Sequence, residues 1–226
     1  MKLAGPQCAK CGMKDKICES PDGNGPTFCP TLHPRGCVEK ANQDYMDPDI
    51  LKFAHAASVQ EGECYANRDR RPYVPYPIKP RVQETCEFAQ KMGYKKLGIA
   101  FCGGLHREAL SLTQILEAQG FEVVSVICKV GRTPKEYIGI RDEEKVRIGQ
   151  FEPMCSPIAQ VLTLNEEETD FNVLLGLCVG HDSLFLKYSK AYCTVLVAKD
   201  RVLGHNPCAA LYTTNSYYAR MLKEGF

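Results

Sequence analysis

Thirteen cysteines stand out in this chain of 226 residues. The first four comprise a Cys-x2-Cys pair and two further cysteines, the last of which is followed by proline. A Cys-x2-Cys pair lets two thiolates of one tight turn reach the same metal, and two more thiolates complete a shell of four ligands. The predicted ligands of this first site are Cys8, Cys11, Cys18 and Cys29, and Cys37 could replace one of them.

The spacing of this first group favours iron and sulfide over zinc. Zinc sites usually present two Cys-x2-Cys pairs, whereas this segment has one. A cysteine followed directly by proline, as in Cys29-Pro30, is a recurring end of ferredoxin-type ligand runs. We therefore predict a 4Fe-4S cluster here, with a structural zinc ion as the alternative.

A second group of cysteines is defined by the predicted fold. Cys102, Cys128 and Cys178 each end a predicted strand, and Cys155 opens a predicted helix. In a parallel α/β sheet, the carboxyl ends of the strands and the amino ends of the following helices share one edge. Helix amino ends lower thiol pKa and stabilise anions. We predict a second iron–sulfur cluster on these four thiols; the alternative is that they pack as small apolar side chains.

Polar residues and glycines are predicted at the same edge. His181 and Asp182 follow the third strand and are the candidate catalytic acid and base. Asp182 could equally be a first-turn carboxylate favoured by the helix dipole. Glycine permits close approach of the backbone to a ligand. The candidates for binding a cofactor or a small anion are Gly103, Gly104, Gly180, Arg107, His205 and Asn206.

The elements that would position these residues alternate from residue 81 onward. Short apolar, β-branched runs follow helical stretches, a pattern that predicts a Rossmann-like parallel sheet of about four strands with helices on both faces. The predicted strands are 97–102, 122–128, 171–178 and 194–199, and the predicted helices are 81–92, 103–119, 155–164, 180–190 and 215–223. We interpret the charged stretch 129–154 as a solvated loop.

The amino-terminal part has a different character. Residues 1–47 are rich in cysteine, glycine and proline and lack apolar periodicity, so we expect bound metal to organise them. Residues 48–80 are predicted to form a helix over 48–63, capped by Asp47, and a proline-rich connector over 71–80. The α/β domain then covers 81–226. The remaining cysteines, interpreted as packing residues, are Cys64, Cys86, Cys193 and Cys208.

Composition argues against several classes of protein. With 28 basic and 27 acidic residues the net charge is +1, which gives no overall field to attract nucleic acid or an anionic membrane. The sequence has no apolar run of membrane-spanning length and no signal-peptide pattern, so we expect a cytoplasmic protein. Cytoplasmic thiols stay reduced, and cysteine at this density then indicates metal binding or catalysis rather than disulfides.

Several motifs resemble a known family. Besides Cys8-x2-Cys11, these are Met92-Gly-Tyr-Lys-Lys-Leu-Gly-Ile-Ala-Phe-Cys102, Gly176-Leu-Cys-Val-Gly-His-Asp-Ser-Leu-Phe185 and Lys199-Asp-Arg-Val-Leu-Gly-His-Asn-Pro207. Together they resemble a family of uncharacterised cysteine-rich proteins of anaerobic bacteria and archaea, a domain of unknown function to which metal binding is attributed. The resemblance implies metal binding and brings no established reaction. Cys155-Ser-Pro157 departs from the family's usual Cys-Asn-Pro.

The predicted function is that of an iron–sulfur metalloprotein with two cysteine-ligated sites. It would couple redox chemistry or electron transfer to a small-molecule substrate, including sulfur-containing ones, and exchange electrons with a partner protein. An iron–sulfur oxidoreductase and a sulfur-handling enzyme both fit this prediction. A zinc-stabilised α/β binding or regulatory module without redox activity is the alternative. A third hypothesis is a thiol-redox or persulfide-carrying enzyme that uses Cys178.

Overall fold

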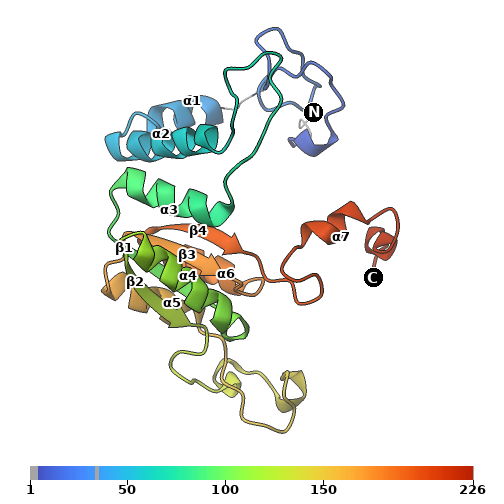
Figure 1. The fold of residues 1–226 in the computed structure, drawn as a ribbon. Coiled ribbons are helices and arrows are strands. Elements are labelled where there is room, and N and C mark those ends of the chain that lie inside the picture. Colours follow the sequence, from blue (N-terminus) through green and yellow to red (C-terminus); the bar gives the residue numbers. More distant parts are fainter. Residues whose placement is uncertain (1–4, 34–35, 226) are drawn as a thin grey trace. The chain divides into compact units, whose positions relative to one another are not determined.

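The computed structural model describes residues 5–33 and 36–225. The chain divides into two compact units, residues 1–62 and residues 63–226 (Figure 1). All 13 cysteines carry free thiols. None of the helices in the described parts of the chain combines the length and the apolarity that crossing a membrane requires.

The first unit contains the cysteine-rich segment and two helices, α1 (Cys37–Asp44) and α2 (Pro48–Glu63). The Asp47 carboxylate caps α2, because its Oδ1 accepts hydrogen bonds from the N–H groups of Asp49 at 3.0 Å and Ile50 at 3.1 Å. The predicted helix and its cap are thus confirmed. Helix α1 was not predicted, and none of its residues is buried.

The second unit is built on a four-stranded parallel sheet, as predicted. Its strands are β1 (Lys96–Phe101), β2 (Glu122–Ile127), β3 (Phe171–Leu175) and β4 (Tyr192–Val197), in the order β2-β1-β3-β4. Strands β1, β2 and β3 end earlier than predicted. The three cysteines expected at their last positions therefore lie in the loops just beyond them.

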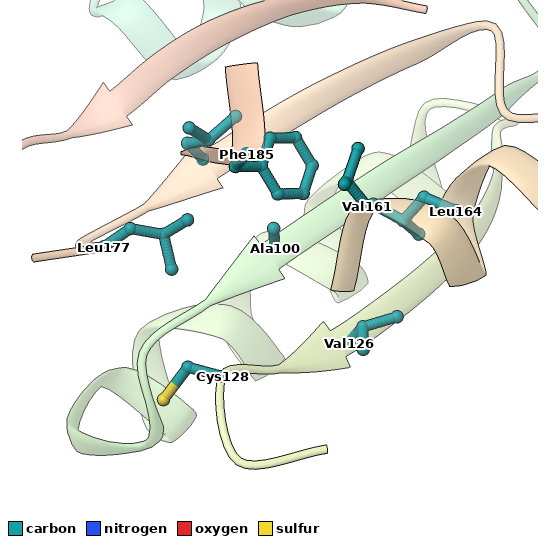
Figure 2. Close-up of a cluster of buried hydrophobic side chains, with 8 residues drawn as sticks. Ala100, Val126, Cys128, Val161, Leu164, Leu177 and Phe185 are labelled. Atoms are coloured by element: carbon teal, nitrogen blue, oxygen red, sulfur yellow. The ribbon is translucent and has the colours of Figure 1, made fainter. Parts of the chain in front are cut away.

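Helices cover both faces of the sheet. They are α3 (Arg81–Met92), α4 (His106–Ala118), α5 (Pro157–Glu166) and α6 (His181–Tyr188). On one face, Ala100 and Val126 of the strands pack with Val161 of α5 and Phe185 of α6 (Figure 2). Helix α4 packs on β1 and β2. Every residue of β3 is buried, as expected for a parallel strand covered on both sides.

The carboxyl-terminal part differs from the prediction. Instead of one helix over 215–223, the chain forms α7 (Cys208–Tyr212) and a short 3-10 turn, Ala219–Leu222. Pro207 precedes α7, a position at which proline suits the start of a helix. The intervening residues 213–218 include Thr, Asn, Ser and Tyr, whose helix propensity is low.

The stretch 129–154 is an excursion between β2 and α5 whose residues are mostly exposed, in agreement with the predicted solvated loop. Its two arms meet at a bridge between Pro134 and Pro153. Lys135 pairs with the buried Glu152 at 2.8 Å, and Lys145, whose side chain is 5% exposed, pairs with Asp142 at 3.0 Å. These ion pairs inside the excursion were not predicted.

Candidate metal centre at the carboxyl edge of the sheet

The backbone places Cys102 and Cys128 side by side at the edge where the strands end. The Cys102 N–H donates to the Leu175 carbonyl at 3.1 Å, and the Cys128 N–H donates to the Phe101 carbonyl at 2.8 Å. Each cysteine therefore continues the pairing between strands by one position before the chain turns away. In Figure 2, Cys128 lies just past the tip of β2, beside the loop that follows β1.

Cys155 reaches the same place because the excursion 129–154 returns to its starting point. The Met154 N–H donates to the Thr133 carbonyl at 2.8 Å, and the Ser156 N–H donates to the Cys128 carbonyl at 2.8 Å. These two bonds hold Cys155 against Cys128. Pro157 then occupies the first position of α5, so the chain enters the helix directly from the site.

The three thiols interact with one another, with Cys128 between the other two. Cys128 is buried and interacts with both Cys102 and Cys155. This interaction is the largest cause that lowers the pKa of Cys102 to about 4 and that of Cys155 to about 5, and it raises the pKa of Cys128. Thiols in the apolar core behave differently, because burial raises the pKa of Cys86 and of Cys193.

Backbone N–H groups of the glycine pair also face this group. The Gly103 N–H donates to the Cys128 sulfur at 3.4 Å, and the Gly104 N–H helps to lower the pKa of Cys102. A Cβ placed on Gly104 would lie 3.9 Å from the Cys102 sulfur, an ordinary contact. The glycine pair thus contributes N–H groups to the site, and a side chain at Gly104 would not be excluded by the Cys102 sulfur.

Cations surround the thiols. Lys199 hydrogen-bonds to Cys102 and further lowers the pKa of that thiol, while Lys129 and His181 act in the same way on Cys155. Within residues 5–33 and 36–225, neither lysine forms an ion pair with a carboxylate. The charges that face these two lysines are thiolates.

Cys178, the fourth predicted ligand, interacts with an arginine instead. It lies in the loop between β3 and α6, and its carbonyl accepts the N–H groups of His181 at 2.9 Å and Asp182 at 3.2 Å. Its sulfur accepts a hydrogen bond from Nη2 of Arg201 at 3.0 Å. The structure thus brings three of the four predicted ligands close enough to shift one another's pKa, and Cys178 lies at the same edge with a different partner.

The two candidate acid–base residues take different positions. His181 begins α6 and lies close enough to Cys155 to lower the pKa of that thiol. The Asp182 carboxylate accepts the N–H of its neighbour Ser183 at 2.8 Å, a local interaction in the first turn of α6. The geometry therefore places His181 near the thiols. The interaction of Asp182 is that of a carboxylate in the first turn of a helix, which was the alternative to a catalytic role.

The other predicted ligand-binding residues lie around this edge. The N–H of Asp200 donates to Nδ1 of His205 at 3.1 Å, so this histidine holds the loop that follows β4. Asn206 is exposed, and its N–H donates to the Leu203 carbonyl at 3.1 Å. Arg107 is exposed in the first turn of α4. Gly180 caps α6 with a φ of +83°, a conformation that favours glycine.

Lys199 and Arg201 were not predicted as site residues. A signal for them was available, because both directly follow the last strand and therefore belong to the same carboxyl edge as the cysteines. They also lie in a motif that resembles the family, Lys199-Asp-Arg-Val-Leu-Gly-His-Asn-Pro207.

In the amino-terminal segment, the tight turn predicted for the Cys-x2-Cys pair is present. The Cys11 N–H donates to the Cys8 carbonyl at 3.0 Å, and Lys16 lies near both Cys11 and Cys18. Cys29 is buried, and the N–H groups of the residues after it, Leu32 first, lower its pKa. Cys37, the predicted substitute ligand, is exposed at the start of α1.

The donor sets of both sites suit a thiophilic metal, although neither forms a finished cage. No group of three or more Cys, His, Asp or Glu side chains in the described parts of the chain is already arranged around a metal position. Thiolates are the ligands of zinc and of iron–sulfur clusters, and N–H groups directed at sulfur tune such centres. Cys102, Cys128 and Cys155, with two lowered pKa values, fit this chemistry.

These features define a cysteine-rich α/β protein with a group of thiols at the carboxyl edge of a parallel sheet. Residues 29–196 match the family described as "Protein of unknown function (DUF1847)", and the chain belongs to this family. It is also similar to the uncharacterized protein MJ0455 of Methanocaldococcus jannaschii, with 43% identity over 188 residues, 83% of this chain and 89% of that protein. No solved structure matches the chain.

Proposed function

We propose that this protein is a cytoplasmic iron–sulfur metalloprotein in which Cys102, Cys128 and Cys155 hold a cluster at the carboxyl edge of the sheet. One observation carries the proposal: backbone hydrogen bonds at the carboxyl edge bring together three cysteines from distant parts of the sequence, and Cys128 interacts with both of the others. Each sulfur in such a group can become a ligand of iron. Cys178, on the same edge, remains the candidate for the fourth ligand.

The charge around the thiols supports an anionic centre. A cluster bound by thiolates carries net negative charge, and nearby cations and N–H groups stabilise it. Lys129 and Lys199 face the thiols without an ion-pairing carboxylate in the described part of the chain, and Gly103 and Gly104 direct N–H groups at them. A group of packing cysteines would need no such surroundings.

The amino-terminal segment would hold a second metal through Cys8, Cys11, Cys18 and Cys29. Its turn at Cys8 and Cys11 and the N–H groups that lower the pKa of Cys29 are those of a thiolate site. A second cluster there would relay electrons between a partner protein and the sheet-edge centre, where a small molecule would react. In this reading the protein is an iron–sulfur oxidoreductase or a sulfur-handling enzyme, and His181, beside Cys155, would move the proton.

The test is the metal and sulfide content of the protein purified without oxygen, together with its EPR spectrum. Two cubane clusters would give about eight iron and eight acid-labile sulfide per chain. Replacing Cys102, Cys128 or Cys155 by Ser should remove about half of both. Cys193→Ser is the matched control, because Cys193 is a half-buried thiol of β4 and should leave both contents unchanged.

A colourless protein, or iron and sulfide contents that the three substitutions leave unchanged, would contradict the proposal. The competing candidate is a zinc-stabilised binding or regulatory module in which zinc occupies the amino-terminal site. The observation in its favour is the single tight turn at Cys8 and Cys11, which resembles a metal knuckle. That candidate predicts about one zinc per chain, retained by Cys102→Ser and lost by Cys11→Ser.

A further inference from the structure

The loop that follows β4 is held in one shape by its own hydrogen bonds. The Asp200 carboxylate accepts the N–H groups of Val202 at 2.9 Å and Leu203 at 2.8 Å. His205 closes the loop, because its N–H donates to the Asp200 carbonyl at 2.9 Å while its Nδ1 accepts the Asp200 N–H. Residues 199–205 thus form a compact turn at the carboxyl edge of the sheet.

This turn presents two cations to two different thiols. The Arg201 guanidinium donates to the Cys178 sulfur at 3.0 Å, and Lys199 reaches Cys102. Lys199 passes over Gly176, where a Cβ would lie 3.6 Å from its Cε and 2.0 Å from Cδ1 of Leu105. Gly176 has a φ of +66°, so both its backbone and the space around it favour glycine.

Arg201 has free capacity for an anion. A guanidinium carries five N–H donors in a planar fork that matches a carboxylate or a phosphate, and one of its nitrogens serves Cys178. Elsewhere in this unit, cations such as Lys79 and Lys135 pair with carboxylates, whereas Arg201 forms no such pair within the described residues. Arg201 is exposed. Val179 and Val202, which follow Cys178 and Arg201 in the sequence, are 92% and 80% exposed.

We propose that Arg201 and Lys199 bind the anionic group of a small-molecule ligand of the centre, and that Cys178 lies beside this ligand. The inference deepens the proposed function, because it assigns the molecule that the centre takes to the class of small carboxylates and related oxyanions. In this assignment Cys178 bonds to Arg201 in the ligand-free protein and faces the ligand in place of serving as the fourth metal ligand, while Cys102, Cys128 and Cys155 hold the metal.

Two alkylating reagents that differ in charge test this assignment. Iodoacetate and iodoacetamide both react with a thiolate, whose sulfur displaces iodide and forms a C–S bond, but iodoacetate also carries a carboxylate. The protein is reduced, freed of metal and treated with each reagent, and the rate at each cysteine is read from its peptide by mass spectrometry. The ratio of the two rates cancels the thiolate fraction of that cysteine, because both reagents need the thiolate.

At Cys178 the iodoacetate-to-iodoacetamide ratio should exceed the ratio at Cys208 by about tenfold, the effect of one charge-assisted hydrogen bond to the carboxylate. Cys208 is an exposed thiol of the same chain and serves as the internal reference. Arg201→Gln should bring the ratio at Cys178 down to that of Cys208. Arg70→Gln, which removes an exposed arginine between α2 and α3, should leave the ratio unchanged.

Equal ratios at Cys178 and Cys208, no reaction at Cys178 with either reagent, or a preference that survives Arg201→Gln would each overturn the inference. Acetate and inorganic phosphate, added separately, distinguish the two anion chemistries: whichever binds should slow iodoacetate at Cys178, and protection by neither would also count against the site. Because the metal-free protein is used, these results are independent of the iron and sulfide content that tests the proposed function.

Discussion

Cys128 is the hub of the thiol group, so its removal gives the most direct test of the site's chemistry. In the metal-free protein, the interaction with Cys128 is the largest cause of the lowered pKa of both Cys102 and Cys155. We expect Cys128→Ala to raise both pKa values toward 9.0, the value for an ordinary thiol. The result would show that the three sulfurs interact in solution.

The rate of alkylation at one pH is a poor measure of this change. At pH 7, lowering the pKa from 9.0 to about 4 raises the thiolate fraction of Cys102 about 100-fold, because pH 7 lies two units below the pKa of an ordinary thiol. The intrinsic nucleophilicity of the thiolate falls by about 100- to 300-fold over the same five units, with a Brønsted coefficient of about 0.4–0.5. The two effects nearly cancel.

The pH profile of the rate separates the two cases. Between pH 6 and 8 (about one to four units above the pKa values of Cys102 and Cys155), both thiols are already ionised, so the rate of alkylation by iodoacetamide should be flat. In Cys128→Ala the rate should rise about tenfold per pH unit over the same interval, because ionisation is then incomplete. Peptide mass spectrometry after quenching gives the rate at each cysteine.

Cys193→Ala is the matched control for the loss of a thiol, since the Cys193 sulfur contacts the Ala191 carbonyl at 3.4 Å and not the three edge thiols. This variant should keep the flat profile at Cys102 and Cys155. A profile that already rises with pH in the unmodified protein would refute the reasoning, because it would mean that neither thiol is ionised by its neighbours. A flat profile that survives Cys128→Ala would refute the role given to Cys128.

Two other predictions concern the scaffold. Phe185→Ala should lower the free energy of unfolding by about 3–5 kcal/mol, because Phe185 is fully buried between α6 and the sheet. Leu184→Ala, at a 39% exposed position, should lower it much less, and urea denaturation measures both. The bond with Lys135 lowers the pKa of Glu152 from 4.5 to about 2, so this pair should stabilise the excursion 129–154 above pH 4.5 and lose its effect as the pH falls toward 2. Glu152→Gln should make cleavage in the excursion by an added protease faster at pH 7, and unchanged cleavage would contradict the pairing.

The fold of the second unit could be predicted because its signals are local. Apolar runs with β-branched residues mark the strands, and glycines mark the ends of helices, so the alternation of β1, α4, β2, α5, β3, α6 and β4 follows from the pattern. The carboxyl-edge rule then places Cys102, Cys128 and Cys155 together without any knowledge of side-chain contacts. The backbone hydrogen bonds of Cys102, Cys128 and Ser156 place these residues at that edge, and metal binding by their thiols stays a prediction.

Other features depend on interactions that a linear pattern does not contain. The excursion 129–154 has the composition of a solvated loop, and its structure comes from specific partners, such as Lys135 with Glu152, that only the fold brings together. The hydrogen bond from Arg201 to Cys178 likewise joins residues 23 positions apart.

The distribution of charge connects the two parts of the site. Lys135 and Lys145 of the excursion are neutralised by its own carboxylates. The cations that remain without ion pairs in the described chain at this edge, Lys129, Lys199 and Arg201, each direct their charge at a cysteine. A site built only to bury cysteine would raise thiol pKa, as it does for Cys86. The lowered pKa values of Cys102 and Cys155, together with these three cations, therefore support a site organised around negative charge, which both a metal–thiolate centre and an anionic ligand would bring.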